Sequence, residues 1–98
     1  MKVVFDELAS KEFNDAIEYY EFEFEGLGQK FRGEIKRAIK TLKRFPKIGV
    51  VEEGDIRRYI LHKFPYKIMY SLEKEYIFII AIAHMHRRPN YWVNRIKP

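Results

Sequence analysis

Apolar residues recur at spacings of three and four along two stretches of the first half of the chain, which is the period of an amphipathic helix. The first stretch follows Ser10, a favourable N-cap residue, with Glu12 in the first turn. The second follows Gly26-Leu27-Gly28 and ends before Pro46. The apolar positions of the first stretch are Phe13, Ala16, Ile17, Tyr20 and Phe24. Those of the second stretch are Phe31, Ile35, Ala38, Ile39, Leu42 and Phe45. The pattern predicts two helices joined by a tight connection, each with one apolar face.

The remaining apolar runs are typical of strands. Residues 2–5, 56–62, 66–72 and 76–84 are rich in β-branched and aromatic residues, whereas residues 48–55 contain two glycines and predict a loop. Residues 76–84 are nearly all apolar, which predicts a central strand buried on both faces. We therefore expect one small α+β domain over residues 1–98, ordered β-α-α-β-β-β, with a helical hairpin packed on a mainly antiparallel sheet.

Charge is distributed unevenly along the chain, whose formal net charge is +5. Residues 1–28 hold eight acids and two bases, a net charge of −6, whereas residues 29–47 hold eight bases and one acid, a net charge of +7. Residues 48–98 add +4. The last two segments favour an anionic or acidic partner.

Composition excludes several classes of protein and site. The chain has no cysteine, which rules out disulfide frameworks, thiolate zinc sites and cysteine nucleophiles. His62, His84 and His86 with scattered acids are too few for a metal site, so neither a metal nor a cofactor is predicted. No apolar run is long enough for a membrane span, and residues 1–13 carry acids where a secretory leader needs an apolar stretch. The expectation is a soluble cytoplasmic protein.

A series of short motifs runs in order from the first helix to the end of the chain. They are Ala16, Tyr19-Tyr20, Gly26-Leu27-Gly28, Phe31, Phe45-Pro46, Arg57-Arg58-Tyr59, residues 64–70, residues 82–89, Tyr91-Trp92 and Arg95. With this series the chain resembles the RelE/ParE superfamily of bacterial toxins from type II toxin–antitoxin pairs. The resemblance implies the fold described above, a cytoplasmic location, a cognate antitoxin bound in a hetero-oligomer, and a protein that slows or kills its own cell when free, as in plasmid stabilisation.

The superfamily divides into two mechanisms. RelE-like members cleave messenger RNA in the ribosome, which needs cations and a base around one phosphate, and ParE-like members poison DNA gyrase without catalytic residues. The resemblance to RelE-like toxins places Arg58, Lys67 and Arg87 in the nuclease set, with His84 or His86 as a possible base. Ile60, which cannot transfer a proton, stands where a second lysine is expected. The incomplete set favours the ParE-like branch, with the ribosome-dependent endoribonuclease as the alternative and a non-toxic binding remnant as a further one.

Candidate residues for contact with the target or the antitoxin are those that carry a positive charge or an aromatic ring expected at the surface. Arginines beside aromatic residues suit both phosphates and protein hot spots, whereas Trp92 is expected to fold back and close the core. The predicted target-binding residues are Arg58, His86, Arg87, Arg88 and Tyr91. The predicted antitoxin-binding residues are Tyr19, Phe22, Lys36 and Lys40. The alternative for the basic face of the second helix, which carries Lys36 and Lys40, is a solvated surface without a partner. The alternative for Tyr19 and Phe22 is local packing.

Overall fold

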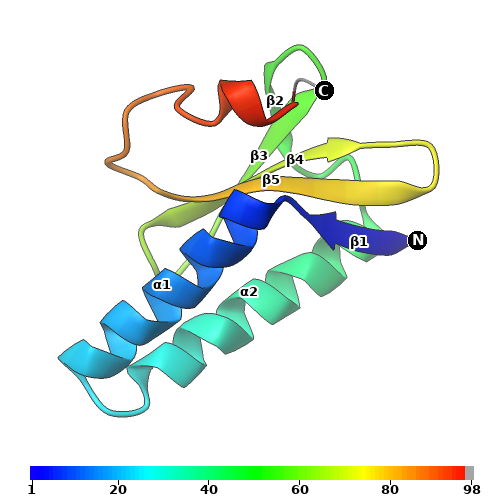
Figure 1. Cartoon of the computed structure of the whole chain (residues 1–98). Coiled ribbons are helices and arrows are strands. Elements are labelled where there is room, and N and C mark those ends of the chain that lie inside the picture. The colour runs from blue at the N-terminus through cyan, green and yellow to red at the C-terminus, as the bar shows by residue number, and fades with distance from the viewer. Residues whose placement is uncertain (97–98) are drawn as a thin grey trace.

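The computed structural model describes residues 1–96 and places two helices on one face of a five-stranded sheet (Figure 1). The fold class predicted from the sequence is confirmed, with one further strand at the edge of the sheet. In chain order the elements are β1 (Lys2–Phe5), α1 (Glu7–Glu23), α2 (Leu27–Arg44), β2 (Val50–Glu53), β3 (Ile56–Ile60), β4 (Tyr66–Leu72), β5 (Tyr76–His84) and a 3-10 helix, η1 (Val93–Ile96).

The sheet has the strand order β1-β5-β4-β3-β2. β2, β3, β4 and β5 form antiparallel neighbours, and β1 pairs in parallel with the first part of β5, from Lys2 opposite Tyr76 to Phe5 opposite Ile79. β5 is an interior strand buried on both faces, as its apolar sequence predicts. β1 is too short to cover the second half of β5, which leaves residues 80–84 without a neighbouring strand on that side.

Each face of the sheet has its own apolar cluster. On the helix face, Ile68 and Ile79 pack with the buried residues of α1 and α2, among them Phe31 and Leu42. On the opposite face, Met69, Ile80, Ala81 and Ala83 pack with Trp92, which comes from the chain after β5. Burial of these side chains is the main favourable term for folding, so the C-terminal segment (residues 85–96) is part of the folded core.

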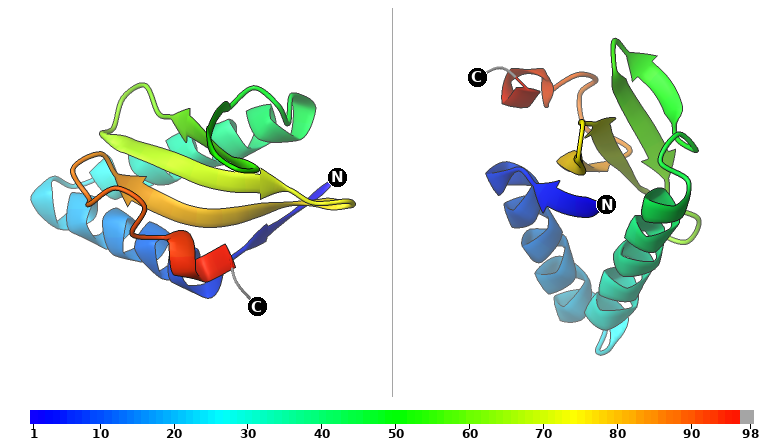
Figure 2. Two further views of the ribbon diagram at one scale, coloured as in Figure 1. Left: turned by 90° about the horizontal axis from the view of Figure 1, so that it is seen from above. Right: turned by 90° about the vertical axis from the view of Figure 1, so that its right-hand side faces the viewer.

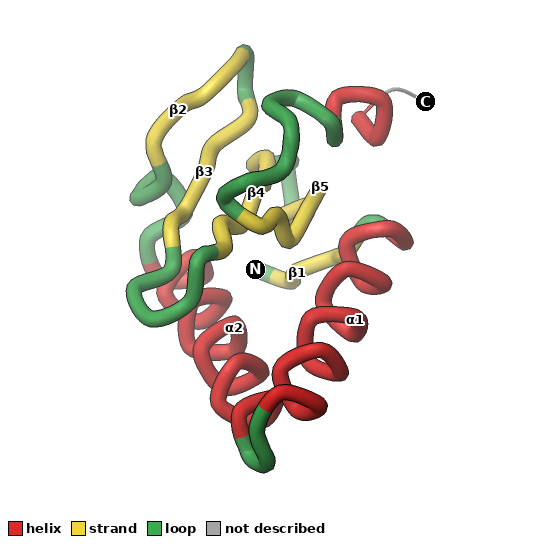
Figure 3. Tube along the Cα trace, turned by 90° about the vertical axis from the view of Figure 1, so that its left-hand side faces the viewer, coloured by secondary structure: helices red, strands yellow, loops and turns green. Residues whose placement is uncertain are grey.

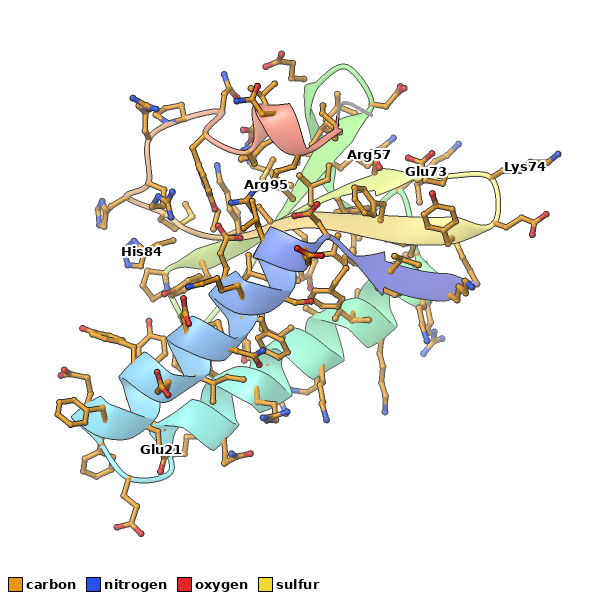
Figure 4. The ribbon with its side chains drawn as sticks, viewed as in Figure 1. Glu21, Arg57, Glu73, Lys74, His84 and Arg95 are labelled. Carbon is orange, nitrogen blue, oxygen red and sulfur yellow. The ribbon has the colours of Figure 1, made fainter. Side chains whose placement is uncertain are left out.

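The two helices meet at their connection and diverge towards the sheet (Figures 2 and 3). Gly26 adopts a left-handed conformation with φ of 88°, which suits glycine. Glu21 of α1 caps α2, because its carboxylate accepts hydrogen bonds from the amides of Gly26 (2.8 Å) and Gly28 (3.0 Å) (Figure 4). The predicted tight connection is confirmed, and it is fixed by a charged group at the positive end of α2.

Gly28→Ala is expected to lower the free energy of unfolding by about 1–3 kcal/mol, because an added methyl overpacks the helix crossing. A Cβ at Gly28 would lie 2.5 Å from the backbone oxygen of Ile17 and 2.9 Å from the Cβ of Glu21. Gly33→Ala is the matched control within α2: its Cβ would meet only the flexible end of Arg37, at 3.3 Å, and helix propensity favours alanine. Urea denaturation of both variants checks this, and equal stabilities would contradict it.

Four predicted helix features are wrong at the helix ends. α1 begins at Glu7 with Asp6 as its N-cap, whose carboxylate accepts from the Leu8 amide at 2.9 Å, so Ser10 lies inside the helix and Glu12 lies beyond its first turn. Phe24 and Phe45, predicted as core positions, are the C-cap residues of α1 and α2 and are 70% and 55% exposed. Both follow the last helical residue, where the helical spacing no longer directs a side chain to the core.

The predicted loop over residues 48–55 is wrong in its central part, because Val50–Glu53 form β2, which pairs with β3. The segment before β2 is held by Tyr70, whose hydroxyl donates to the Pro46 carbonyl (2.7 Å) and accepts from the Gly49 amide (2.9 Å). The strand predicted over residues 56–62 ends at Ile60. The amide of Leu61 still bonds the Tyr66 carbonyl, so the early end reflects the turn that leads into β4.

Candidate functional site

The C-terminal segment leaves the end of β5, turns, and crosses the face of the sheet that the helices do not cover (Figure 1). The turn is fixed by backbone hydrogen bonds from Met85 to the Pro65 carbonyl (2.8 Å) and from Arg87 to the His84 carbonyl (3.0 Å). Trp92 is 1% exposed within the second apolar cluster. The prediction that Trp92 closes the core is confirmed, and this side chain anchors the segment to the sheet.

A partly buried polar network joins α1, β5 and the C-terminal segment. Arg95 forms a two-pronged ion pair with Glu12, with both nitrogen–oxygen distances at 2.9 Å. Tyr91 donates its hydroxyl to the same carboxylate at 2.7 Å. The amide of Ile82 donates to it at 3.0 Å, and Arg95 also donates to the carbonyl of Ile80 at 3.1 Å. The side chains of Glu12 and Arg95 are only 16% and 11% exposed, so this network is a structural anchor. Arg95 is labelled in Figure 4.

The network shifts the pKa values of two of its members. Burial, followed by the hydrogen bond to Glu12 and the charge of that carboxylate, raises the pKa of the Tyr91 hydroxyl well above its usual range. The hydrogen bond to Glu12 raises the pKa of Arg95. At neutral pH the Tyr91 hydroxyl therefore stays protonated and donates a hydrogen bond to Glu12, and Arg95 stays positively charged.

Raising the pH above about 10 is expected to destabilise the fold, and Tyr91→Phe is expected to reduce that loss. Below the unfolded-state pKa the phenol is protonated in both states, and the stabilisation is fully present. Above it the unfolded chain ionises first, so stability falls as the pH rises towards the folded-state pKa. Urea denaturation at about pH 8 and about pH 11 measures the effect, with Tyr19→Phe, at an exposed tyrosine, as control. Equal losses in the wild type and in Tyr91→Phe would contradict it.

The exposed cations of the C-terminal segment lie beside this anchor. The guanidinium carbon of Arg87 lies 3.8 Å from the centre of the Tyr91 ring, within the range of a cation–π contact. Arg87 and Arg88 are both exposed, and the Tyr91 amide lies 3.4 Å from the Arg88 carbonyl. The structure thus brings together Arg87, Arg88 and Tyr91. The hydroxyl of Tyr91 is used internally, so its ring is the part that supports a contact.

His84 and His86 pack against each other at the end of β5, with ring centres 5.2 Å apart. The Nδ1 atom of His84 accepts a hydrogen bond from the His86 amide at 3.1 Å. The His84 ring also stands edge-on to Tyr66, at 5.1 Å, on the helix face of the sheet. His84 therefore serves as packing for the turn, and His86 is the exposed member of the pair.

Arg57 and Arg58 lie on opposite faces of β3, as their adjacent positions require. Arg57 donates to the backbone carbonyls of Lys47 (3.1 Å) and Gly49 (2.7 Å), so it fixes the segment before β2. Arg58 lies on the other face, where Glu52 of β2 approaches it at 3.4 Å.

Lys67 of β4 shares that carboxylate with Arg58, because its ammonium nitrogen lies 3.7 Å from the same Glu52 oxygen. All three side chains are partly buried, at 20–35% exposure. Glu52 thus offsets the charge of two cations at once. Two members of the predicted nuclease set are close together, and Glu52 offsets part of their combined charge, which leaves the group of three side chains with a net charge of +1.

The predicted antitoxin-binding residues all lie at the surface of the helical hairpin. Tyr19 and Phe22 of α1 are 57% and 88% exposed, and Lys36 and Lys40 of α2 are exposed. The ring of Tyr19 packs edge-on against Tyr20, at 5.3 Å, whereas Phe22 takes part in none of the ring contacts among residues 1–96. Exposed apolar rings at a hairpin end are typical of an interaction surface.

Sequence reasoning gave no site role to three residues that shape this region, namely Glu12, Arg95 and Glu52, although Arg95 stands in the motif series and Glu12 was expected in the first turn of α1. Glu12 carries a usable signal: it lies three residues after Ala9 and four before Ala16, on the buried side of α1. An acid on an apolar helix face requires a partner, since charged groups are almost never buried unpaired. Arg95 and Glu52 carry no such signal, because the elements that hold them are defined by long-range contacts.

Two further features are absent from residues 1–96, the part of the chain that the structure describes. No helix in this range is long and apolar enough to cross a membrane. Within the same range no three His, Asp or Glu side chains are gathered so that they could hold a metal ion.

Comparisons with known structures support the fold. The chain is similar to a ParDE toxin–antitoxin structure from P. aeruginosa, with a TM-score of 0.64, 13% identity, and coverage of 86% of this chain and 95% of that one. It is similar to the isolated RelE toxin of E. coli, with a TM-score of 0.65, 23% identity and 98% coverage of each chain. A mutant E. coli RelE in complex with a peptide of the antitoxin RelBc gives a TM-score of 0.64, 20% identity, and coverage of 98% and 94%.

Sequence comparisons identify the family. A search of the curated proteins gave no match to this chain. The family model of the ParE toxin of the type II toxin–antitoxin system parDE matches residues 3–89, which include both helices, β1 except its first residue, the other four strands, and the exposed Arg87 and Arg88. With a match over most of its length, this chain belongs to the ParE toxin family of type II toxin–antitoxin systems.

Proposed function

We propose that this toxin inhibits DNA gyrase by binding it, without bond-making chemistry of its own, and that a cognate antitoxin neutralises it. The observation that carries the proposal is the pairing of Arg58 and Lys67 with Glu52. Cleavage by a ribose hydroxyl needs uncompensated cations and a proton-transfer group around one phosphate. Here one carboxylate partly neutralises two of the candidate cations, and Ile60, 46% exposed, stands where the resemblance to RelE-like toxins leads us to expect a lysine.

The exposed surface of the C-terminal segment suits the binding function. Arg87 lies against the Tyr91 ring and Arg88 is its exposed neighbour along the chain, on a segment anchored by Trp92 and by the Glu12–Arg95 pair. Arginine and aromatic residues dominate the energetics of protein interfaces. A rigid support for these cations lowers the entropy lost on binding. We therefore assign target binding to Arg87 and Arg88, with His86 at the edge of the same turn and Arg58 as a more distant candidate.

Two assays separate gyrase inhibition from the endoribonuclease alternative. Purified protein is added to a gyrase supercoiling reaction and, separately, to ribosomes translating a defined message. We expect inhibition of supercoiling with an intact message, and an increase of at least tenfold in the half-inhibitory concentration for Arg87→Ala. Lys43→Ala, at an exposed cation of α2, is the matched control.

The opposite results are equally informative. Cleavage of the message that is lost in Arg87→Ala, with supercoiling unaffected, would establish the endoribonuclease and overturn the gyrase proposal. Normal growth of cells that express the chain without an antitoxin would favour a non-toxic binding remnant.

For the antitoxin we propose a surface of the helical hairpin that includes the exposed rings of Tyr19 and Phe22 on α1 and, further along α2, the exposed side chains of Lys36 and Lys40. This surface combines apolar rings with cations, so it suits an antitoxin segment that carries apolar and acidic side chains. Tyr19 and Phe22 are 57% and 88% exposed, so truncation of either side chain should change the stability of the fold little.

Phe22→Ser is expected to weaken antitoxin binding by roughly thirtyfold while leaving the melting temperature unchanged, because an interface hot spot contributes about 2 kcal/mol or more. Titration calorimetry with the cognate antitoxin measures the affinity. Leu8→Ser, at an apolar residue 50% exposed near the start of the same helix, is the matched control. Unchanged affinity in Phe22→Ser would remove α1 from the antitoxin surface.

A further inference from the structure

The second half of β5 has an edge without a neighbouring strand, and two side chains occupy its place. β1 pairs with β5 only as far as Ile79. Beyond that point the Ile80 carbonyl accepts a hydrogen bond from Arg95, and the Ile82 amide donates one to Glu12. The guanidinium supplies the donor and the carboxylate the acceptor that a sixth strand would provide. The ion pair therefore completes the edge of the sheet and is held in place by it.

Glu12 links the backbone of β5 to surface residues through its hydrogen bond with Tyr91. The carboxylate accepts a hydrogen bond from the Tyr91 hydroxyl, with 2.7 Å between the two oxygens, which sets where the Tyr91 ring lies. The guanidinium carbon of Arg95 is 5.0 Å from the centre of that ring, and that of Arg87 is 3.8 Å from it. The contacts form a continuous path from the backbone of β5, through Glu12 and Tyr91, to the exposed Arg87.

We propose that Glu12 is a positioning residue for target recognition, which acts by fixing the Tyr91 ring as the platform that presents Arg87. The inference rests on the proposed role of Arg87 in target binding. A mobile arginine side chain loses conformational entropy about several rotatable bonds when it binds. An arginine already stacked on a fixed ring loses less, so the network raises affinity without contacting the target.

The platform itself is tested by proton NMR, independently of any target. Protons under an aromatic ring are shifted upfield, so we expect the δ-methylene protons of Arg87 to be shifted in the wild type. The shift should shrink in Glu12→Gln and in Tyr91→Phe, which keeps the ring but loses the bond to Glu12. Glu18→Gln, at an exposed acid of α1, is the matched control and should keep the shift. If the shift persists in Tyr91→Phe, the positioning role is overturned; this variant decides the question even if Glu12→Gln does not fold.

The consequence for recognition is tested by a double-mutant cycle on growth inhibition, which does not depend on the identity of the target. We expect Tyr91→Phe to raise the expression level needed for half-maximal inhibition roughly two- to tenfold. In an Arg87→Ala background it should have no further effect. A purely structural role predicts the same factor in both backgrounds, which would overturn the inference while leaving the proposed function intact.

The remaining outcomes concern the proposed function. If Arg87→Ala is as inhibitory as the wild type, the assignment of target binding to Arg87 fails, and the recognition role of Glu12 fails with it. If growth is inhibited and the cycle is non-additive but gyrase is unaffected, the positioning role is supported and the target is a different one.

Discussion

Arg95→Met is expected to lower the free energy of unfolding by about 3–5 kcal/mol, because it leaves the Glu12 carboxylate buried without its cation. Glu12 would keep the Tyr91 hydroxyl and the Ile82 amide as donors, but neither carries a charge. The Ile80 carbonyl would also lose its donor. Since small domains are stable by about 5–15 kcal/mol, this loss would remove a large fraction of the stability of the protein. Urea denaturation followed by circular dichroism measures it.

Two further variants separate loss of charge pairing from loss of packing. Arg88→Met makes the same chemical change at an exposed arginine and should alter stability by less than about 0.5 kcal/mol. Adding Glu12→Gln to Arg95→Met removes the unpaired charge while retaining an acceptor for Tyr91 and Ile82, so it should recover part of the loss. A double variant less stable than Arg95→Met would mean that the buried charge is not the cause.

The helical hairpin was predictable because its apolar positions repeat with the helical period. In α2 the predicted positions Phe31, Ile35, Ala38 and Leu42 are all buried. The period holds only as far as the helix does. Phe45 follows the last helical residue, and its amide bonds Thr41 while its side chain points away from the core. Periodicity therefore predicts which face is buried more securely than where that face ends.

β2 could not be predicted from its own sequence. Val50 and Val51 are followed by two glutamates, both valines are more than half exposed, and glycines lie on either side. Its conformation is defined by pairing with β3 and by the contacts of Tyr70 and Arg57 with the preceding segment. Such long-range contacts override local propensity. The missed strand matters for function, since it carries the Glu52 that pairs with Arg58 and Lys67.

The exposed residues of the candidate site could be predicted from the sequence, whereas the ion pair beneath them could not. Arg87, Arg88 and Tyr91 are adjacent in sequence, so their proximity follows from the chain itself. Glu12 and Arg95 are far apart in sequence and meet only because the C-terminal segment crosses back over β5. A sequence pattern identifies neighbours along the chain, whereas an ion pair between distant elements requires the fold.

Leu42→Ala is expected to lower the free energy of unfolding by about 2–5 kcal/mol, since it removes a buried anchor and leaves a cavity. Leu42 is fully buried near the end of α2, within the cluster that joins the helices to the sheet. Lys40→Ala, two residues away on the exposed face of α2, should be nearly neutral. Thermal melts followed by circular dichroism compare the two variants. If Lys40→Ala proved the more destabilising, the helix face assigned to the core would be wrong, and with it the position of every element that packs on α2.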